Sequence, residues 1–310
     1  MKSFLHKTLL IAAAVLTLPA MAENYSVGTG SQSGTYYPFG GILAKIWSEN
    51  IPEVNARAEV TAASVENIIK VSSNKQLAGI AMGNVALKAH QGEKPFPREM
   101  PASVLFALYP NVVQIIVPAK SDIKRVADLK GKKVSLGAPG SGTRVSAVNI
   151  LSILGVEESD IEAQSLNYTA TTDALANGQI DAGVIVGSLG VGAITELALT
   201  RDIRILSFSA DEMAKVRAAA PAYMDFDAAE GAYNKVAAFK APAVWNVLMV
   251  NKDLDENLAY QMTKTAFEHM DELRQAISDA RYTTLENMEK LEGVPLHPGA
   301  LRYLNEQRAK

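Results

Sequence analysis

Four times along this sequence, a short strand runs into a loop of glycine and hydroxyl residues that opens a helix. The four loops cover residues 28–35, 61–67, 137–143 and 187–192. Strands that alternate with helices form a mostly parallel sheet, and such sheets bind ligands at the loops that follow their strands. The pattern therefore predicts an α/β fold whose binding site is built from several loops.

The alternating units fall into two series. The first covers residues 25–90 and the second covers residues 134–208, with apolar, β-branched runs at 104–109 and 112–117 between them. A chain of this length can divide into two α/β lobes, and two segments that cross between the lobes would leave a ligand cleft with a hinge beside it. We therefore expect a two-lobed protein.

The end of the chain is expected to return to the first lobe. A strand run at 243–251 is followed by a long helical pattern at 257–277. The expected boundaries are a signal peptide at 1–22, a first lobe at 23–112 and 240–310, and a second lobe at 113–239.

Residues 1–22 have the parts of a cleavable export signal. Lys2 and Lys7 make the start basic, and Leu9–Leu18 form an apolar run too short to span a bilayer. Ala20–Ala22 fit a small-residue cleavage site, so the mature chain would begin at Glu23 in the periplasm, without direct membrane insertion. An uncleaved membrane anchor is the alternative, and the short apolar run disfavours it.

The charge of the chain narrows its partners. The 30 Lys and Arg residues against 33 Asp and Glu residues give a net charge of −3, without a basic block. Such a chain lacks the electrostatic footprint of a nucleic-acid or anionic-lipid partner. With 48% hydrophobic residues and no cysteine, it resembles a globular α/β protein that needs no disulfides. We expect a monomer that binds a small, enclosed ligand.

The first loop has the chemistry of an anion site. Gly28, Gly30 and Gly34 allow close approach of the backbone, and the N–H groups at the following helix start favour a carboxylate or phosphate. Glycine and serine are also common in turns without a ligand, so the prediction rests on the repetition of such loops. The candidate ligand-binding residues are Ser33, Gly34, Thr35, Tyr36, Ser64, Asn67, Asn84, Tyr109, Ser141, Gly142, Thr143, Arg144, Ser188 and Trp245.

Two of these candidates have open alternatives. Arg144 either pairs with a ligand carboxylate or points into solvent. Trp245 either forms a wall of the cleft or packs between the lobes.

Nucleotide, metal and catalytic motifs fail on their spacing. Residues 137–142 have glycines at P-loop spacing, but Thr143 and Arg144 stand where Lys and Ser or Thr are required. Gln32 occupies the position in which a nucleophile elbow needs serine. The histidines beyond the leader lie far apart, without metal-ligand spacing. We therefore expect no enzyme, no cofactor and no metal.

Several of these motifs together resemble the TAXI-class solute-binding proteins of tripartite ATP-independent periplasmic (TRAP) transporters. The matching motifs, in family order, are Gly28–Gly30, Gly34–Pro38, Ser64–Asn67, Asp128–Val134, Gly140–Thr143 and Gly178–Ala182. They span nearly the whole mature chain. Residues Gly30–Ser33 depart from the all-glycine form common in the family, and their side chains either bind ligand or narrow the pocket.

The resemblance implies a two-lobed periplasmic binding protein of type II-like architecture. Such a receptor would capture glutamate, 2-oxoglutarate or a related dicarboxylate or amino acid by cleft closure and deliver it to TRAP permease subunits driven by an ion gradient. Ser33–Tyr36 would hold one end of a dicarboxylate and Ser141–Thr143 the other. The alternatives are a same-fold binding protein of an ATP-driven transporter or sensor, a periplasmic enzyme, and a structural or adhesive protein.

Overall fold

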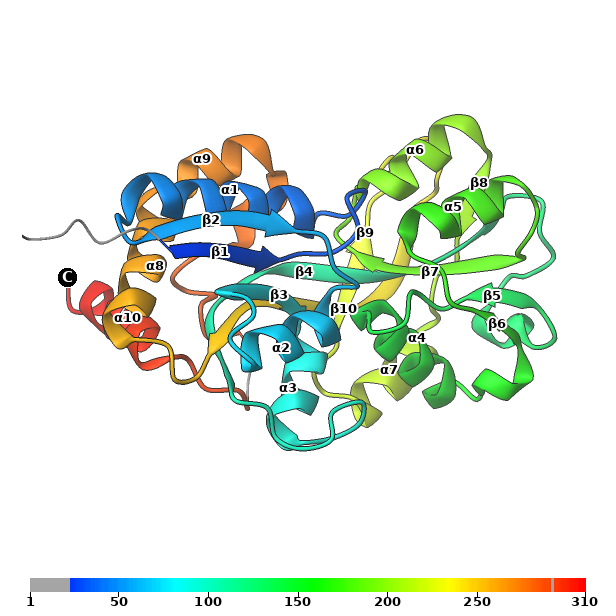
Figure 1. Cartoon of the computed structure of the whole chain (residues 1–310). Coiled ribbons are helices and arrows are strands. Elements are labelled where there is room, and N and C mark those ends of the chain that lie inside the picture. Colours follow the sequence, from blue (N-terminus) through cyan, green and yellow to red (C-terminus); the bar gives the residue numbers. More distant parts are fainter. Residues whose placement is uncertain (1–22, 291–292) are drawn as a thin grey trace, which may run out of the picture.

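The chain folds into two lobes that share one ten-stranded sheet (Figure 1). The computed structural model describes residues 23–290 and 293–310, so the predicted signal peptide at 1–22 lies outside the described residues. The expected lobe boundaries, after residues 112 and 239, stay predictions.

Parallel strands form the outer parts of the sheet. The continuous path runs through β2 (Val54–Glu59), β1 (Glu23–Gly28), β3 (Ala78–Met82), β10 (Phe239–Asn251), β4 (Ala102–Pro118), β7 (Ala182–Gly187), β5 (Lys133–Ser135) and β6 (Glu162–Gln164). β8 (Ile203–Ile205) pairs with β4, and β9 (Met224–Ala228) pairs with β10. β1 is parallel to β2 and β3, and β5 is parallel to β6 and β7, which confirms the α/β prediction.

Helices cover both faces of the sheet in each lobe. They are α1 (Tyr36–Asn50), α2 (Ser64–Ser72), α3 (Gly83–Gln91), α4 (Gly142–Ile153), α5 (Tyr168–Ala176), α6 (Gly192–Thr200), α7 (Ala210–Ala219), α8 (Glu256–Glu268), α9 (Met270–Ala276) and α10 (Pro298–Arg308). Figure 1 shows α1 and α9 opposite α2 and α3 in one lobe, and α5 and α6 opposite α4 and α7 in the other. Within the described residues, none of the helices combines the length and the apolar character needed to cross a membrane.

Two long strands, β4 and β10, cross between the lobes. The sequence predicts separate runs at 104–109 and 112–117, but the structure has a single strand that continues through Pro110. β10 is irregular between Trp245 and Val247, where Trp245 lies opposite Pro110. A bulge suits this position because proline has no N–H to donate to the ladder.

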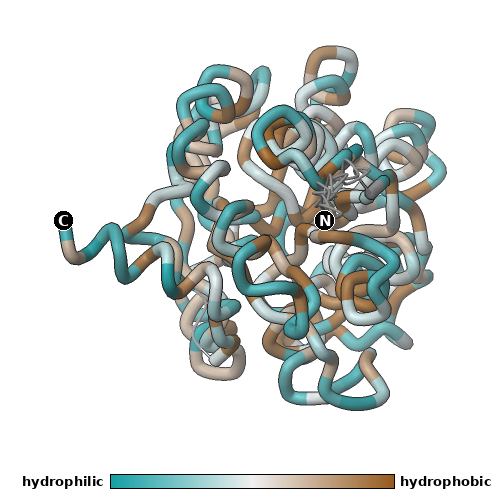
Figure 2. The backbone as a smooth tube through the Cα atoms, turned by 60° about the vertical axis from the view of Figure 1, so that its left-hand side comes forward, coloured by the Kyte–Doolittle hydropathy of each residue, from teal (hydrophilic) through white to brown (hydrophobic). Residues whose placement is uncertain are grey.

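Two apolar clusters fill the space between sheet and helices. One packs α1 and α8 against the first lobe and contains Trp47, whose indole N–H donates to the Met262 carbonyl at 2.9 Å. The other includes Val65, Ile116 and Val216 and so extends through both lobes. In Figure 2, brown segments lie mainly in the interior and teal segments mainly on outward turns.

The prediction of one continuous helix at 257–277 is wrong. The structure has α8 and α9, separated at His269, where φ is −107° and ψ is 19°. The break directs α9 onto α1, and an ion pair of 2.6 Å joins Glu272 to Lys45. α7, α10 and β9 are additional to the elements that the sequence predicts.

Candidate functional site

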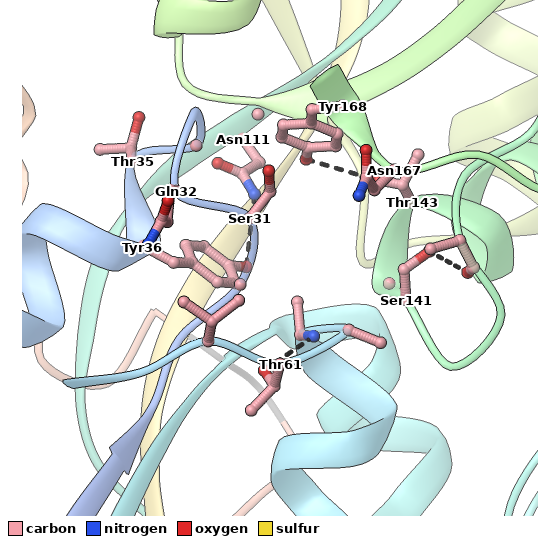
Figure 3. A pocket seen from close by; sticks show the side chains of 18 of the residues that line it. Ser31, Gln32, Thr35, Tyr36, Thr61, Asn111, Ser141, Thr143, Asn167 and Tyr168 are labelled. Atoms are coloured by element: carbon pink, nitrogen blue, oxygen red, sulfur yellow. Dashed lines mark hydrogen bonds between the residues drawn. The ribbon is translucent and has the colours of Figure 1, made fainter. Parts of the chain in front are cut away.

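A cavity of about 270 Å³ lies between the two lobes (Figure 3). Most of its lining comes from segments 30–36, 60–63, 138–143, 167–169 and 187–188. Each segment follows one of the parallel strands, β1, β2, β5, β6 or β7. The carboxyl ends of these strands therefore meet at one site, as parallel topology requires.

Four helices begin at the cavity wall, and a polar residue precedes three of them. Thr35, Ser141 and Asn167 immediately precede α1, α4 and α5, and all three line the cavity. Ser141 Oγ accepts the Arg144 N–H at 3.1 Å, and Asn167 Oδ1 accepts the Ala170 N–H at 2.9 Å. The other first-turn N–H groups have no carbonyl partner in their own helix, and the helix dipole adds partial positive charge. The free N–H groups and the helix dipoles together favour binding of an anion in the cavity.

None of the described residues that line the cavity has a charged side chain. The guanidinium of Arg144 instead contacts Glu158 at 2.5 Å and Ser165 at 3.3 Å. Anion binding in the cavity would therefore rest on neutral hydroxyl, amide and N–H donors.

The structure divides the predicted site residues into two groups. The residues that line the cavity are Gly34, Thr35, Tyr36, Ser141, Gly142, Thr143 and Ser188. The residues that do not line it are Ser33, Ser64, Asn67, Asn84, Tyr109, Arg144 and Trp245. Both groups include residues of the same loops. The direction of a residue within its loop therefore decides whether it lines the cavity.

Ser64 and Asn67 are fully buried and hold the backbone together. Ser64 Oγ accepts the Met82 N–H at 3.1 Å. Asn67 Nδ2 donates to the carbonyls of Thr29 at 2.8 Å and Ile80 at 2.9 Å. These bonds tie α2 to the ends of β1 and β3, so both side chains have a structural role here.

Asn84, Tyr109 and Trp245 lie outside the cavity for different reasons. Asn84 Nδ2 donates to the Tyr223 hydroxyl at 2.8 Å, between the lobes. Tyr109 is fully buried in the apolar cluster of the first lobe. Trp245 packs edge-on against the ring of Tyr282, which lies in the same expected lobe, so packing of Trp245 between the lobes stays a prediction.

One loop at the cavity, residues 167–169, is absent from the predictions made from sequence. The helix that follows this loop, α5, begins at Tyr168. This loop has no glycine, and its one sequence signal is Asn167, a residue type favoured at helix N-caps. Asn111, which also lines the cavity, was not among the candidates, whereas Gln32 belongs to the segment Gly30–Ser33 whose side chains were expected to bind ligand or narrow the pocket.

Two tyrosines from different lobes provide fixed polar walls (Figure 3). The Tyr168 hydroxyl donates to the Val186 carbonyl at 2.6 Å. The Tyr36 hydroxyl donates to Asn246 Oδ1 at 2.5 Å and accepts from Asn111 Nδ2 at 3.3 Å. Burial raises the pKa of Tyr168 to about 12 and also raises that of Tyr36, so both phenols stay neutral donors near pH 7.

Contacts between the lobes close the cavity. Thr35 Oγ1 lies 2.5 Å from Ser188 Oγ, and Ser33 Oγ lies 3.0 Å from Thr169 Oγ1. The Ala193 N–H donates to the Ser33 carbonyl at 3.2 Å. The two lobes are therefore in direct contact beside the cavity.

Ala63, in the cavity wall, has strained backbone dihedrals. Its φ of 79° and ψ of −138° suit glycine and are rare for other residues. We expect Ala63→Gly to raise the free energy of unfolding by about 1 kcal/mol, because relief of strain exceeds the added entropy of the unfolded chain. Ala62→Gly should lower it, since Ala62 has no positive φ. Urea unfolding of both variants checks this, and equal changes would contradict it.

The architecture of two α/β lobes with a cavity between them is the fold of periplasmic solute-binding proteins of type II-like organisation. The chain belongs to the NMT1-like family, whose sequence profile matches residues 27–307. The match is to the family as a whole, and the narrower TAXI resemblance stays a prediction.

Solved structures share the fold at low sequence identity. The alkanesulfonate-binding protein SsuA from Xanthomonas axonopodis pv. citri, bound to MOPS, has a TM-score of 0.50 and 18% identity, over 92% of this chain and 85% of that chain. A putative L-cystine ABC transporter protein from Listeria monocytogenes has a TM-score of 0.53 and 15% identity, over 85% of this chain and 99% of that chain. PhnD1 from Prochlorococcus marinus, in complex with methylphosphonate, has a TM-score of 0.52 and 12% identity, over 93% of this chain and 98% of that chain.

Proposed function

We propose that this chain is an extracytoplasmic, periplasmic receptor that captures a small organic anion by closing its two lobes. The observation that carries the proposal is the interlobe cavity, at whose wall α1, α4 and α5 begin. A ligand held there would contact both lobes at once. Binding would then stabilise the closed form, because an open form offers only one half of the contacts.

The neutral donors of the cavity are sufficient for useful affinity. Hydrogen bonds to a charged group contribute about 1.5–3 kcal/mol each, from which the ordering of ligand and side chains must be subtracted. Thr35, Ser188 and Asn167 supply hydroxyl or amide groups, and the helix starts add backbone N–H groups. Glutamate, 2-oxoglutarate and related anions, expected from the TAXI resemblance, are the first ligands to test.

A binding role is favoured over catalysis. The solved structures with this fold include an alkanesulfonate-binding protein and a phosphonate complex, and neither is described as an enzyme. Their ligands belong to those proteins, but oxyanion recognition in two of them supports an anion as the ligand class here.

The receptor would deliver its ligand to a membrane transporter. The similar fold of an ABC transporter protein supports an ATP-driven partner. The TAXI resemblance instead implies a TRAP permease, a partnership that the comparisons do not support. Uptake into vesicles with the receptor added outside separates the two, because ATP inside would drive the first and an ion gradient alone would drive the second.

Ligand binding should appear as thermal stabilisation of the mature protein. A ligand at a hundred times its dissociation constant stabilises the folded form by about 2.7 kcal/mol. We expect an organic anion to raise the melting temperature and Thr35→Val to weaken its affinity about tenfold, because the variant loses the hydroxyl contact with Ser188. Thr200→Val, on the surface of α6, is the matched control. Absence of any shift, together with no molecule released on denaturation, would refute the proposal.

A further inference from the structure

The cavity has one wall unlike the others. Val60, Ala62 and Ala63 present apolar side chains, and Met82 adds a thioether. Figure 3 places Thr61, in the same loop, on the side of the cavity away from Tyr168 and Thr143. We call Val60, Ala62, Ala63 and Met82 the apolar wall.

The backbone donors beside the apolar wall already have partners. The Ala62 N–H donates to Glu66 Oε2 at 2.7 Å, and the Ala63 N–H donates to Thr61 Oγ1 at 3.0 Å. At the start of α2, the Val65 N–H donates at 3.2 Å to the Gly140 carbonyl of the second lobe. In the closed form, α2 therefore cannot offer these N–H groups to a ligand, unlike the starts of α1, α4 and α5.

The charge beside the apolar wall is also unfavourable to an anion. Glu66 brings a carboxylate to the Ala62 N–H, and Lys70, 3.1 Å from Glu66, is also paired with Glu59. A second anionic group beside Ala62 and Ala63 would lose part of its hydration without gaining a donor, and such a loss is unfavourable.

We infer that the site takes a small monocarboxylate, with its carboxylate at the starts of α1, α4 and α5 and its uncharged, apolar end against the apolar wall. This inference rests on the proposed function and narrows it. It opposes the dicarboxylate that the family resemblance suggests, because a dicarboxylate would place one charge beside Val60 and Ala62.

A set of matched ligands tests the inference by calorimetry at pH 7.5. We expect affinity to rise roughly fourfold for each methylene from propanoate through butanoate to pentanoate, as each adds buried apolar area. Glutarate has the five-carbon chain of pentanoate with a carboxylate in place of the terminal methyl group. It should bind at least tenfold more weakly than pentanoate. Glutarate or glutamate binding as tightly as pentanoate would overturn the inference and leave the proposed function intact, whereas failure of every anion to bind would overturn both.

A charge introduced at the apolar wall provides the second test. Val60 is 51% exposed, so Val60→Lys should fold normally while offering a cation to a second carboxylate. We expect this variant to bind glutarate more tightly and pentanoate no more tightly than the natural chain does. Ile69→Lys, at a 46% exposed position of α2 outside the cavity lining, adds the same charge as the control. An unchanged ratio of the two affinities in Val60→Lys would contradict the placement of the ligand's tail.

Discussion

Replacing Gly142 with alanine is expected to hold the lobes apart and to abolish most ligand binding without unfolding either lobe. Gly142 starts α4 in the second lobe, and a Cβ there would lie 2.4 Å from Ser64 Oγ and 2.9 Å from Met82 Sδ in the first lobe. The thioether of Met82 can move, but Ser64 is fully buried and accepts the Met82 N–H. The clash therefore acts across the cleft.

The expected loss of affinity follows from the cost of closure. Overpacking of this kind costs about 1–3 kcal/mol, and the open form does not incur it. Affinity should fall roughly 10- to 100-fold, since only the closed form completes the site. Calorimetry measures the affinity, and solution scattering should show a larger radius of gyration with ligand present than for the natural chain.

Gly41→Ala is the matched control for Gly142→Ala. Gly41 lies within α1, and the nearest atom to an added Cβ is the Ala58 side chain at 3.9 Å. This variant should bind ligand normally. If Gly142→Ala also binds normally and closes to the same radius, the contact between Gly142 and Ser64 is not part of the closed form in solution.

Asn67→Ala should cause the largest loss of stability. The fully buried Asn67 amide donates to two backbone carbonyls, those of Thr29 and Ile80, and its Oδ1 accepts from the Thr61 hydroxyl at 2.7 Å. Alanine removes three hydrogen bonds and leaves a void, so we expect the free energy of unfolding to fall by about 3 kcal/mol or more. Urea unfolding without ligand measures this.

The outcome of that experiment also separates a structural from a ligand-binding role. Asn55→Ala, at an exposed residue of β2, should change stability by less than about 0.5 kcal/mol. If Asn67→Ala leaves stability unchanged but reduces affinity, Asn67 contacts ligand as the sequence analysis expected, and its buried hydrogen bonds contribute little.

The architecture was predictable because its signals are local. The apolar runs and the glycine and hydroxyl loops that follow them predicted β1 with α1 and β5 with α4. The predicted elements were wrong where one local sequence pattern is compatible with two structures. The helical periodicity at 257–277 continues past His269, although the helix does not, and the runs beside Pro110 join because β10 bulges opposite the proline.

The site was predictable only as a set of loops. Thr35, Ser141 and Thr143 could be chosen because residues at strand-to-helix turns of a parallel sheet gather at one edge. Ser64 has the same sequence signal, yet it is buried beneath Met82. Asn167 was missed because its loop has no glycine, although it precedes a helix at the cavity just as Ser141 does.

The sequence by itself determined the alternation of strands and helices in the two series at 25–90 and 134–208 and the edge of the sheet at which the loops meet, since hydrophobic period and turn residues act over a few neighbouring positions. The tertiary structure alone decided which polar groups remain open to a ligand. The Gly140 carbonyl from one lobe takes the Val65 N–H of the other, and Glu158 draws Arg144 away from the cavity. Such contacts join residues distant in the chain, and no local pattern encodes them.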